Sequence, residues 1–235
     1  MKKVVKLKDL EIVDTSDKLY EGFNNFMLSQ DLKVFGKLLA RTQLFDQVKD
    51  LPGDIVECGV FKGTGLFTFL KLKRYLCPNS GKKVIGFDYF DTDSLLKSLS
   101  DHDQEAMRVL FDDRAFKHSD GYYKYLNEFV LSCGFQSHEF DLVKGDICKT
   151  SYNYCAEHPG FRISLLYIDL DVENPTYEAL NALWDRVVQG GIVVFDEYGF
   201  HQWSEANGVD KFFEDKDIDL KSLDFICPSA YVVKK

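Results

Sequence analysis

Five apolar runs, each carrying an acidic residue at or near its end, alternate with segments whose apolar residues recur every three or four positions. The runs lie at 54–59, 83–90, 140–146, 162–170 and 192–198. Strands that alternate with helices build parallel sheets, because a parallel connection needs roughly a dozen or more residues. Two further strands are expected between 220 and 234, with an antiparallel strand at the C-terminus. The alternation predicts an α/β fold: a doubly wound, mostly parallel, Rossmann-like sheet with helices on both faces.

The whole chain, residues 1–235, is expected to form one domain, because no repeat, low-complexity stretch or linker interrupts the pattern. Helical spacing predicts N-terminal helices within residues 1–51, which could close the site or build a homodimer. Residues 91–137 are longer than a simple crossover requires. They are expected to form an insertion, either as a lid over the acceptor or as an oligomer contact.

Charge and cysteine content exclude several classes of protein. A net charge of −9 without a basic stripe argues against a nucleic-acid partner, which would need lysine and arginine contacts to phosphates. The six cysteines include no CxxC pair, so neither a zinc knuckle nor a disulfide framework is expected. No apolar stretch reaches the length of a signal-peptide core or a membrane span. We therefore expect a cytoplasmic protein with no membrane partner.

The helix after the fourth run has clear sequence boundaries. Asn174 can cap it, Pro175 suits its first position, and Gly190 is expected to end it. Its apolar stripe consists of Tyr177, Leu180, Leu183, Trp184 and Val187.

Acidic residues stand at the ends of the predicted strands. They are Glu57, Asp88, Asp146, Asp169, Asp171, Asp196 and Glu197. In an open parallel sheet, ligands bind beyond the carboxyl ends of the strands. A single acid at such a place is commonly a turn former or a helix cap. Acids at five strand ends in succession instead indicate a binding site at this edge.

The loop after the first strand, ECGVFKGTG, contains Gly59, Gly63 and Gly65. Its spacing differs from the GxGxxG pattern of dinucleotide-binding loops, which argues against a nicotinamide cofactor, while a plain strand-to-helix turn stays open. Glu57 would repel a pyrophosphate but could accept hydrogen bonds from an ammonium group, and Asp88 is placed to bind both hydroxyls of a ribose. A nucleoside that carries an amino acid and no phosphate satisfies both conditions.

Asp169 and Asp196 should lie close together if the fourth and fifth strands are neighbours, because paired strands are about 4.8 Å apart. Two close carboxylates stay ionised only at high cost, so either one holds a proton or a cation lies between them. Together with Glu197 they would form a hard oxygen set suited to Mg²⁺ or another hard divalent cation such as Ca²⁺ or Mn²⁺, with Asp171 as a supporting residue. The alternative is that these acids only cap helices and face solvent.

Several segments resemble, in the same order, those of class I methyltransferases, and more narrowly the macrocin and mycinamicin O-methyltransferases together with the novobiocin-type sugar O-methyltransferases. The segments are LPGDIVECGVFKGTG, VIGFDYFDT, KGDI, RISLLYIDLD, ALWDRVVQGGIVVFDEYG and GVDKFF, and the similarity covers roughly residues 35–213. The resemblance implies a seven-stranded methyltransferase sheet, S-adenosylmethionine as cofactor and a required Mg²⁺. It also implies a small-molecule acceptor, a sugar or glycoside that is methylated on a hydroxyl group.

Carried over residue by residue, the resemblance implies a set of site residues. The methionine part of the cofactor would lie near Glu57, Gly59 and Gly63, the ribose on Asp88 and the adenine near Asp146; the metal ligands would be Asp169, Asp196 and Glu197. Relatives often carry a tyrosine and a glutamate where this chain has Glu173 and Asn174. This departure from the family pattern concerns the acceptor more than the cofactor. Val172 stands where catechol-type relatives place a lysine base, so that base is excluded here.

The expected reaction is an in-line attack of the acceptor hydroxyl on the sulfonium methyl group, with the protein acting through positioning and electrostatics. Asp169 is the first candidate for the base and His201 the second. Two other classes stay open from the sequence: a nicotinamide-dependent oxidoreductase and a non-catalytic cofactor-binding module of the same fold.

Overall fold

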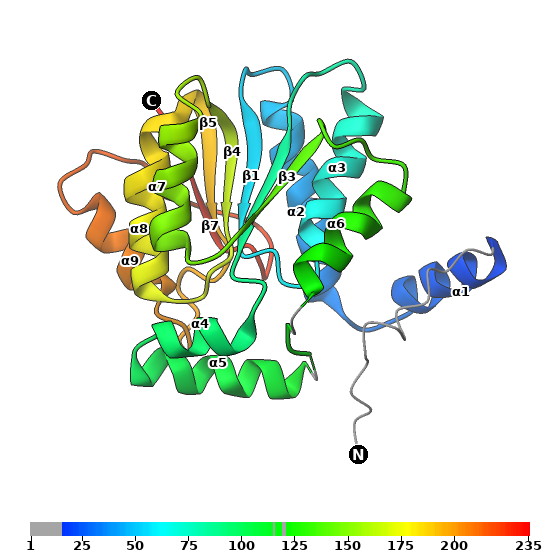
Figure 1. Cartoon of the computed structure of the whole chain (residues 1–235), viewed down its shortest axis with the longest axis horizontal. Coiled ribbons are helices and arrows are strands. Elements are labelled where there is room, and N and C mark those ends of the chain that lie inside the picture. The colour runs from blue at the N-terminus through cyan, green and yellow to red at the C-terminus, as the bar shows by residue number, and fades with distance from the viewer. Residues whose placement is uncertain (1–15, 115, 119–120) are drawn as a thin grey trace.

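A seven-stranded sheet forms the centre of the computed structural model, which describes residues 16–114, 116–118 and 121–235 (Figure 1). The strands are β1 (Asp54–Cys58), β2 (Val84–Asp88), β3 (Phe140–Lys144), β4 (Ile163–Ile168), β5 (Val187–Phe195), β6 (Lys221–Ser222) and β7 (Ala230–Val233). Their order is β3-β2-β1-β4-β5-β7-β6. Strands β1 to β5 pair in parallel, whereas β7 pairs antiparallel with both β5 and β6. The predicted doubly wound, mostly parallel sheet with an antiparallel C-terminal strand is confirmed.

Helices cover both faces of the sheet. They are α1 (Ser16–Met27), α2 (Leu32–Val48), α3 (Thr64–Leu76), α4 (Thr92–Ser98), α5 (Asp101–Asp113), α6 (Tyr122–Ser132), α7 (Ile147–Glu157), α8 (Glu173–Leu183) and α9 (Glu205–Phe213). Helices α7, α8 and α9 pack on one face, and α2, α3 and α6 pack on the other (Figure 1). None of the described helices is long and apolar enough to cross a membrane.

The central strands are buried on both faces, which explains their nearly continuous apolar sequence. All six residues of β4 are buried. In β1 the side chains alternate, so that Val56 and Cys58 join the core under α7, α8 and α9, whereas Ile55 joins the core under α2 and α3. Glu57 therefore points toward the α2 and α3 side, as a buried acid among apolar residues.

The predicted start and end of α8 are wrong. Its first residue is Glu173 and its N-cap is Val172, so Asn174 lies inside the first turn and caps nothing. The Oγ atom of Ser204 instead accepts a hydrogen bond of 2.8 Å from the Glu173 N–H. Pro175 is tolerated in the first turn because the N–H groups there have no partner within the helix.

At its other end, α8 stops at Leu183 and passes through a 3-10 turn, Trp184–Arg186, into β5. Val187 and Gly190 belong to that strand and not to the helix. The pairing of β5 with β4 begins at this point, where Val187 pairs with Ile163.

Within the predicted insertion at 91–137, α4 and α5 run across the strand ends at the carboxyl edge of the sheet, whereas α6 packs on the face that carries α2 and α3 (Figure 1). Met107 and Phe111 of α5 form a small apolar cluster with residues of the loops that follow β1, β4 and β5. These loop residues are Phe61, Val172 and Trp203. The role of residues 91–137, as a lid or as an oligomer contact, stays a prediction.

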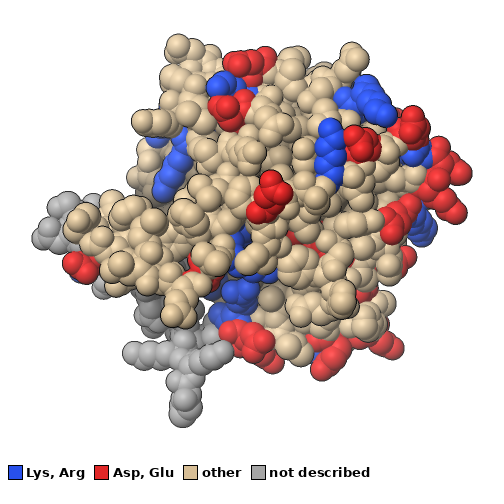
Figure 2. Space-filling model, turned by 180° about the vertical axis from the view of Figure 1, so that it is seen from behind, with Lys and Arg blue, Asp and Glu red and all other residues tan. Residues whose placement is uncertain are grey.

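Helix α1 projects from the body and forms a protrusion with few charged residues (Figures 1 and 2). Its exposed apolar side chains are Leu19, Tyr20, Phe23 and Met27. The start of α2 adds exposed apolar side chains at Leu32, Val34, Leu38 and Leu39. The homodimer expected from the N-terminal helices stays a prediction; the first 15 residues of the 1–51 segment lie outside the described residues.

Gly59 is needed where β1 and β4 end, at the point where the strand order reverses. Its φ is +96°, and a Cβ atom added there would lie 1.8 Å from the carbonyl oxygen of Asp169. The Asp169 N–H donates a hydrogen bond of 2.8 Å to the carbonyl of Cys58. The two loops thus touch through backbone atoms, and any side chain at position 59 would separate them.

We predict that Gly59→Ala destabilises the fold by more than Gly121→Ala does. Both glycines have a φ of +96°, but no atom of the described residues lies within 4 Å of a Cβ atom at Gly121. The backbone conformation costs each alanine variant roughly 1–2 kcal/mol. The clash should cost Gly59→Ala about 1–3 kcal/mol more. Urea unfolding measures both, and equal losses in the free energy of unfolding would show that the close approach is not a constraint.

Candidate active site

The carboxyl edge of the sheet brings the predicted acids together. Strands β4 and β5 pair Ile168 with Phe195, so Asp169 and Asp196 follow at adjacent strand ends. The Asp196 N–H donates a hydrogen bond of 3.0 Å to the carbonyl of Ile168. Asp196 is fully buried, whereas the Asp169 side chain keeps 20% of its surface exposed. The predicted proximity of these two carboxylates is therefore observed.

Helix α2 supplies the positive charge that faces these acids. Lys33, Lys37 and Arg41 are four residues apart and share one face of the helix. The Lys37 Nζ atom lies 2.5 Å from Oδ2 of Asp196 and 3.4 Å from Oδ2 of Asp169. The cation that lies between the two aspartates is thus a lysine ammonium.

Lys33 and Arg41 form ion pairs with acids on either side of Lys37. The Lys33 Nζ atom lies 3.0 Å from Oε1 of Glu197. The Arg41 guanidinium lies 3.4 Å from Oε1 of Glu57 and 3.6 Å from Oδ2 of Asp169. It also lies 4.7 Å from the centre of the Tyr167 ring. Lys33, Lys37 and Arg41 are not among the predicted site residues, although their spacing of four on a helix is visible in the sequence.

The ion pairs set different pKa values for neighbouring acids. Burial raises the pKa of Asp169 to about 6, together with the nearby Asp196 and against the opposing Lys37. For Asp196 burial acts in the same direction, but Lys37 and hydrogen bonds from Cys227 and Tyr167 outweigh it and lower its pKa. Asp196 is therefore the firmly ionised member of the pair, and Asp169 is the one that can exchange a proton near neutral pH.

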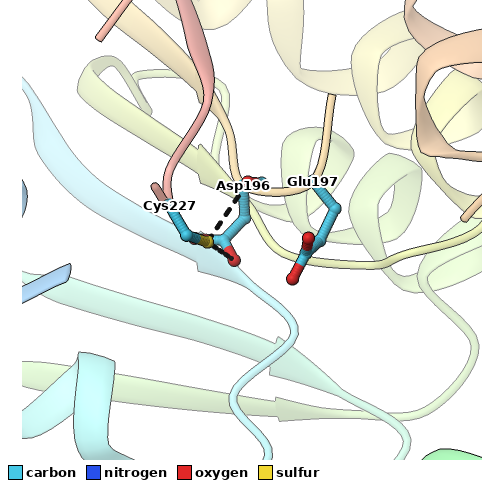
Figure 3. Close-up of side chains that lie close together, drawn as sticks. All are labelled: Asp196, Glu197 and Cys227. Carbon is cyan, nitrogen blue, oxygen red and sulfur yellow. Dashed lines mark hydrogen bonds between the residues drawn. The ribbon is translucent and has the colours of Figure 1, made fainter. Parts of the chain in front are cut away.

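Asp196 has further partners in the site. The Tyr167 hydroxyl donates a hydrogen bond of 2.5 Å to its Oδ1 atom. The Cys227 thiol donates one of 2.8 Å to its Oδ2 atom (Figure 3). The Glu197 backbone N–H donates to Oε1 of Glu205 at 3.0 Å. The Oε2 atom of Glu197 is buried and has no hydrogen-bond partner among the described residues.

Glu57 is buried beneath the first turn of α3. A Cβ atom added at Gly65 would lie 1.6 Å from its Oε1 atom, so the carboxylate packs directly against that glycine. Burial raises the pKa of Glu57 to about 8, and Arg41 opposes the shift. Its Oε2 atom also lacks a partner within the described residues. An ammonium group of a ligand could satisfy that oxygen.

Asp88 is held in place by the loops around it. Its Oδ2 atom accepts a hydrogen bond of 2.9 Å from the Phe61 N–H, and its Oδ1 atom accepts one of 2.8 Å from the Phe90 N–H. His118, from the insertion, places Nδ1 3.6 Å from Oδ1 of Asp88. His118 is not among the predicted site residues, because no sequence pattern connects it with Asp88, 30 positions earlier.

The remaining predicted residues are less closely tied to this cluster. Gly63 is the N-cap of α3, with a φ of +87°. Asp146 caps α7 by accepting a hydrogen bond of 3.1 Å from the Cys148 N–H. His201 is exposed after β5 and has no hydrogen bond or ion pair within the part of the chain that the structure describes. Burial and the nearby Asp169 raise the pKa of Asp171.

Comparison with known proteins agrees with this architecture. Residues 38–229 match the macrocin O-methyltransferase family, TylF. The solved structure of CalS11, a calicheamicin methyltransferase, is 28% identical and has a TM-score of 0.72, over 94% of this chain and 87% of that chain. The O-methyltransferase NovP has the same fold at 19% identity and a TM-score of 0.69, over 85% of this chain and 80% of that chain. A search of individually curated proteins finds no match.

The strand order and the acids at its reversal point define a class I methyltransferase. The chain belongs to the macrocin O-methyltransferase family, which the family match covers from residue 38 to residue 229. The resemblance read from the sequence is confirmed. The two other classes, oxidoreductase and non-catalytic module, are not supported.

We predict that the stability of the protein depends on pH through Glu57. A carboxyl whose pKa rises on folding stabilises the fold when protonated, so this contribution is present below about pH 4 and is lost as the pH rises toward the folded pKa of about 8. The slope is at most about 1.4 kcal/mol per pH unit. Glu57→Gln removes it.

The measurement is the free energy of unfolding of both proteins between pH 5 and pH 8, without ligand. The difference between the Gln variant and the wild type should grow with pH in favour of the variant. Parallel curves, or a difference of the opposite sign, would show that Glu57 is ionised in the folded protein.

Proposed function

We propose that the protein transfers the methyl group of S-adenosylmethionine to a hydroxyl of a sugar or sugar-containing small molecule, with a divalent metal ion. The observation that carries this proposal is the convergence of Glu57, Asp88, Asp169 and Asp196 around the strand reversal in a chain of the macrocin O-methyltransferase family. A ligand at a reversal point contacts the ends of several strands at once.

In this proposal the cofactor lies over the loop after β1. The unpartnered Oε2 of Glu57 accepts from the amino group of the methionine part, and Gly59 and Gly63 let the backbone approach it. Each oxygen of Asp88 already accepts one backbone hydrogen bond and keeps capacity for a second, from the ribose hydroxyls. Asp146 lies at the adenine end.

The carboxylates of Asp169, Asp196 and Glu197 would hold the metal ion. The set fits a hard cation, because Asp196 and Glu197 offer buried carboxylate oxygens, of which Oε2 of Glu197 has no partner in the described chain, and Asp169 faces Asp196 across the Lys37 ammonium. Lys37 lies between the two aspartates and would have to withdraw, which its flexible and partly exposed side chain allows. A bound Mg²⁺ would lower the pKa of the acceptor hydroxyl.

For the base we propose Asp169, with His201 as the second candidate. Asp169 is the one member of the carboxylate pair whose side chain stays partly exposed, at 20%, so an acceptor hydroxyl can reach it. The single domain would use residues 91–137 as a lid, in which α4 and α5 exclude water from the methyl transfer.

The acceptor is proposed to be a sugar, free or linked to a nucleotide. CalS11, the 28% identical neighbour, is described as a TDP-rhamnose 3'-O-methyltransferase. Glu173 and Asn174 differ from the residues usual in relatives and stand at the start of α8, beside the carboxyl edge. They are positioned to adapt the site to a different sugar.

We predict that the protein binds S-adenosylmethionine and not NAD in calorimetric titrations. Asp88→Asn should weaken cofactor binding about 10- to 100-fold, because hydrogen bonds to a charged acceptor contribute about 1.5–3 kcal/mol. Asp46→Asn, on the exposed side of α2, is the matched control and should bind like the wild type. Equal affinities for all three proteins would remove Asp88 from the cofactor site.

We predict that Asp196→Asn binds S-adenosylmethionine but loses metal-dependent turnover by at least about 100-fold. The assay measures S-adenosylhomocysteine released with TDP-rhamnose as the first acceptor, in Mg²⁺ and in chelator. Asp217→Asn, a fully exposed control, should keep full activity. Turnover that persists in chelator, or an Asn variant as active as the wild type, would contradict the metal role.

A further inference from the structure

Cys227 is a buried thiol beside the carboxylates, and the proposed methyl transfer does not use it. Its Sγ atom lies 2.8 Å from Oδ2 of Asp196 and 3.3 Å from the Asp196 carbonyl oxygen (Figure 3). The antiparallel pairing of β5 with β7 fixes this position, because Ala230 pairs with Phe195 and the Ser229 N–H donates to the Phe195 carbonyl at 3.2 Å. The sheet itself holds the sulfur against the end of β5.

Three ligand atoms converge at this place. One atom each of Asp196, Glu197 and Cys227 lies within 4.8 Å of the others, and all three residues are buried. In a tetrahedral site with metal–sulfur and metal–oxygen bonds of about 2.3 and 2.1 Å, sulfur and oxygen are about 3.6 Å apart. The observed 2.8 Å between Sγ and Oδ2 needs only a small opening to admit an ion.

A second observation points to a ligand. The Glu197 residue is 5% exposed, and its Oε2 atom is buried without a hydrogen-bond partner in the described chain. A buried carboxylate oxygen without a partner is costly. A cation bound between Glu197 and Cys227 would satisfy it.

We propose that Asp196, Glu197 and Cys227 form a mixed oxygen and sulfur site for a thiophilic divalent ion such as Zn²⁺ or Co²⁺. Thiolate ligands select such ions, whereas Mg²⁺ prefers oxygen ligands alone. When the sulfur–metal bond forms, the thiol proton leaves to solvent, because the thiolate is the ligand. The open tetrahedral position would take water.

The inference rests on the proposed function only in sharing Asp196 and Glu197 with the Mg²⁺ site. Because both sites use these carboxylates, a thiophilic ion and a hard ion would exclude one another. Lys37 would withdraw from Oδ2 of Asp196 in either case, while Lys33 can keep its contact with Oε1 of Glu197. Cys227 thereby gives this chain a choice of metal that a site made only of carboxylates lacks.

The test is titration of the full chain with Co²⁺, read as the near-ultraviolet charge-transfer absorption of a cobalt–thiolate bond. The wild type should develop this band and Cys227→Ser should lose it. The affinity for Co²⁺ should fall about 100-fold or more, since even residues that only support metal ligands contribute 10- to 100-fold. Cys148→Ser is the control: Cys148 is half-buried and, like Cys227, lies beside an aspartate, Asp146, so its replacement should leave the band unchanged.

The possible outcomes decide on the thiolate site and on the proposed carboxylate site. A band that persists in Cys227→Ser overturns the inference. Binding of Mn²⁺ by calorimetry without a cobalt–thiolate band in the wild type also overturns it, and leaves the carboxylate site standing. If neither ion binds, both fail. If Cys227→Ser does not fold, the wild type and Cys227→Ala decide by the same band.

Discussion

Buried carboxylates at the carboxyl edge of the sheet must be neutralised, and α2 provides the charges that neutralise them. Lys33, Lys37 and Arg41 reach four acids from one helix face, with contacts between 2.5 and 3.6 Å. Without Lys37, the fully buried Asp196 would have to take up a proton or lose its burial. The position of α2 against the sheet and the ionisation of the site therefore depend on one another, and any ion or cofactor that enters must exchange contacts with this helix.

The sheet determines where this exchange takes place. Gly59 lets the loops after β1 and β4 touch through their backbones, which brings Glu57 and Asp169 to the same place without a direct sequence relation. The insertion then covers the edge with α4 and α5, and it delivers His118 to Asp88. The β5 and β7 pairing adds Cys227. The site thus draws on segments from α2 to the C-terminal strands.

The sequence predicted those features that follow from local pattern and sheet geometry. The alternation of strands and helices predicted the sheet, and strand spacing placed Asp169 beside Asp196, because register in a parallel pair follows directly from where each strand ends. Features that depend on distant segments could not be read. Asn174 matches the pattern of a helix cap, but it is the Ser204 Oγ atom that accepts a hydrogen bond from the first turn, donated by the Glu173 N–H. His118 and Cys227 reach the site through tertiary packing alone. The spacing of Lys37 from Lys33 and Arg41 is visible in the sequence, but the acids that it contacts are not.

The most direct test is a crystal structure with S-adenosylhomocysteine and Mn²⁺, in which anomalous scattering locates the metal ion. The expected arrangement has the ribose on Asp88, the amino group at Glu57, and manganese between Asp169, Asp196 and Glu197, with the Lys37 ammonium displaced from Asp196. A nucleoside bound away from the carboxyl edge, or a manganese peak that none of these carboxylates contacts, would contradict it.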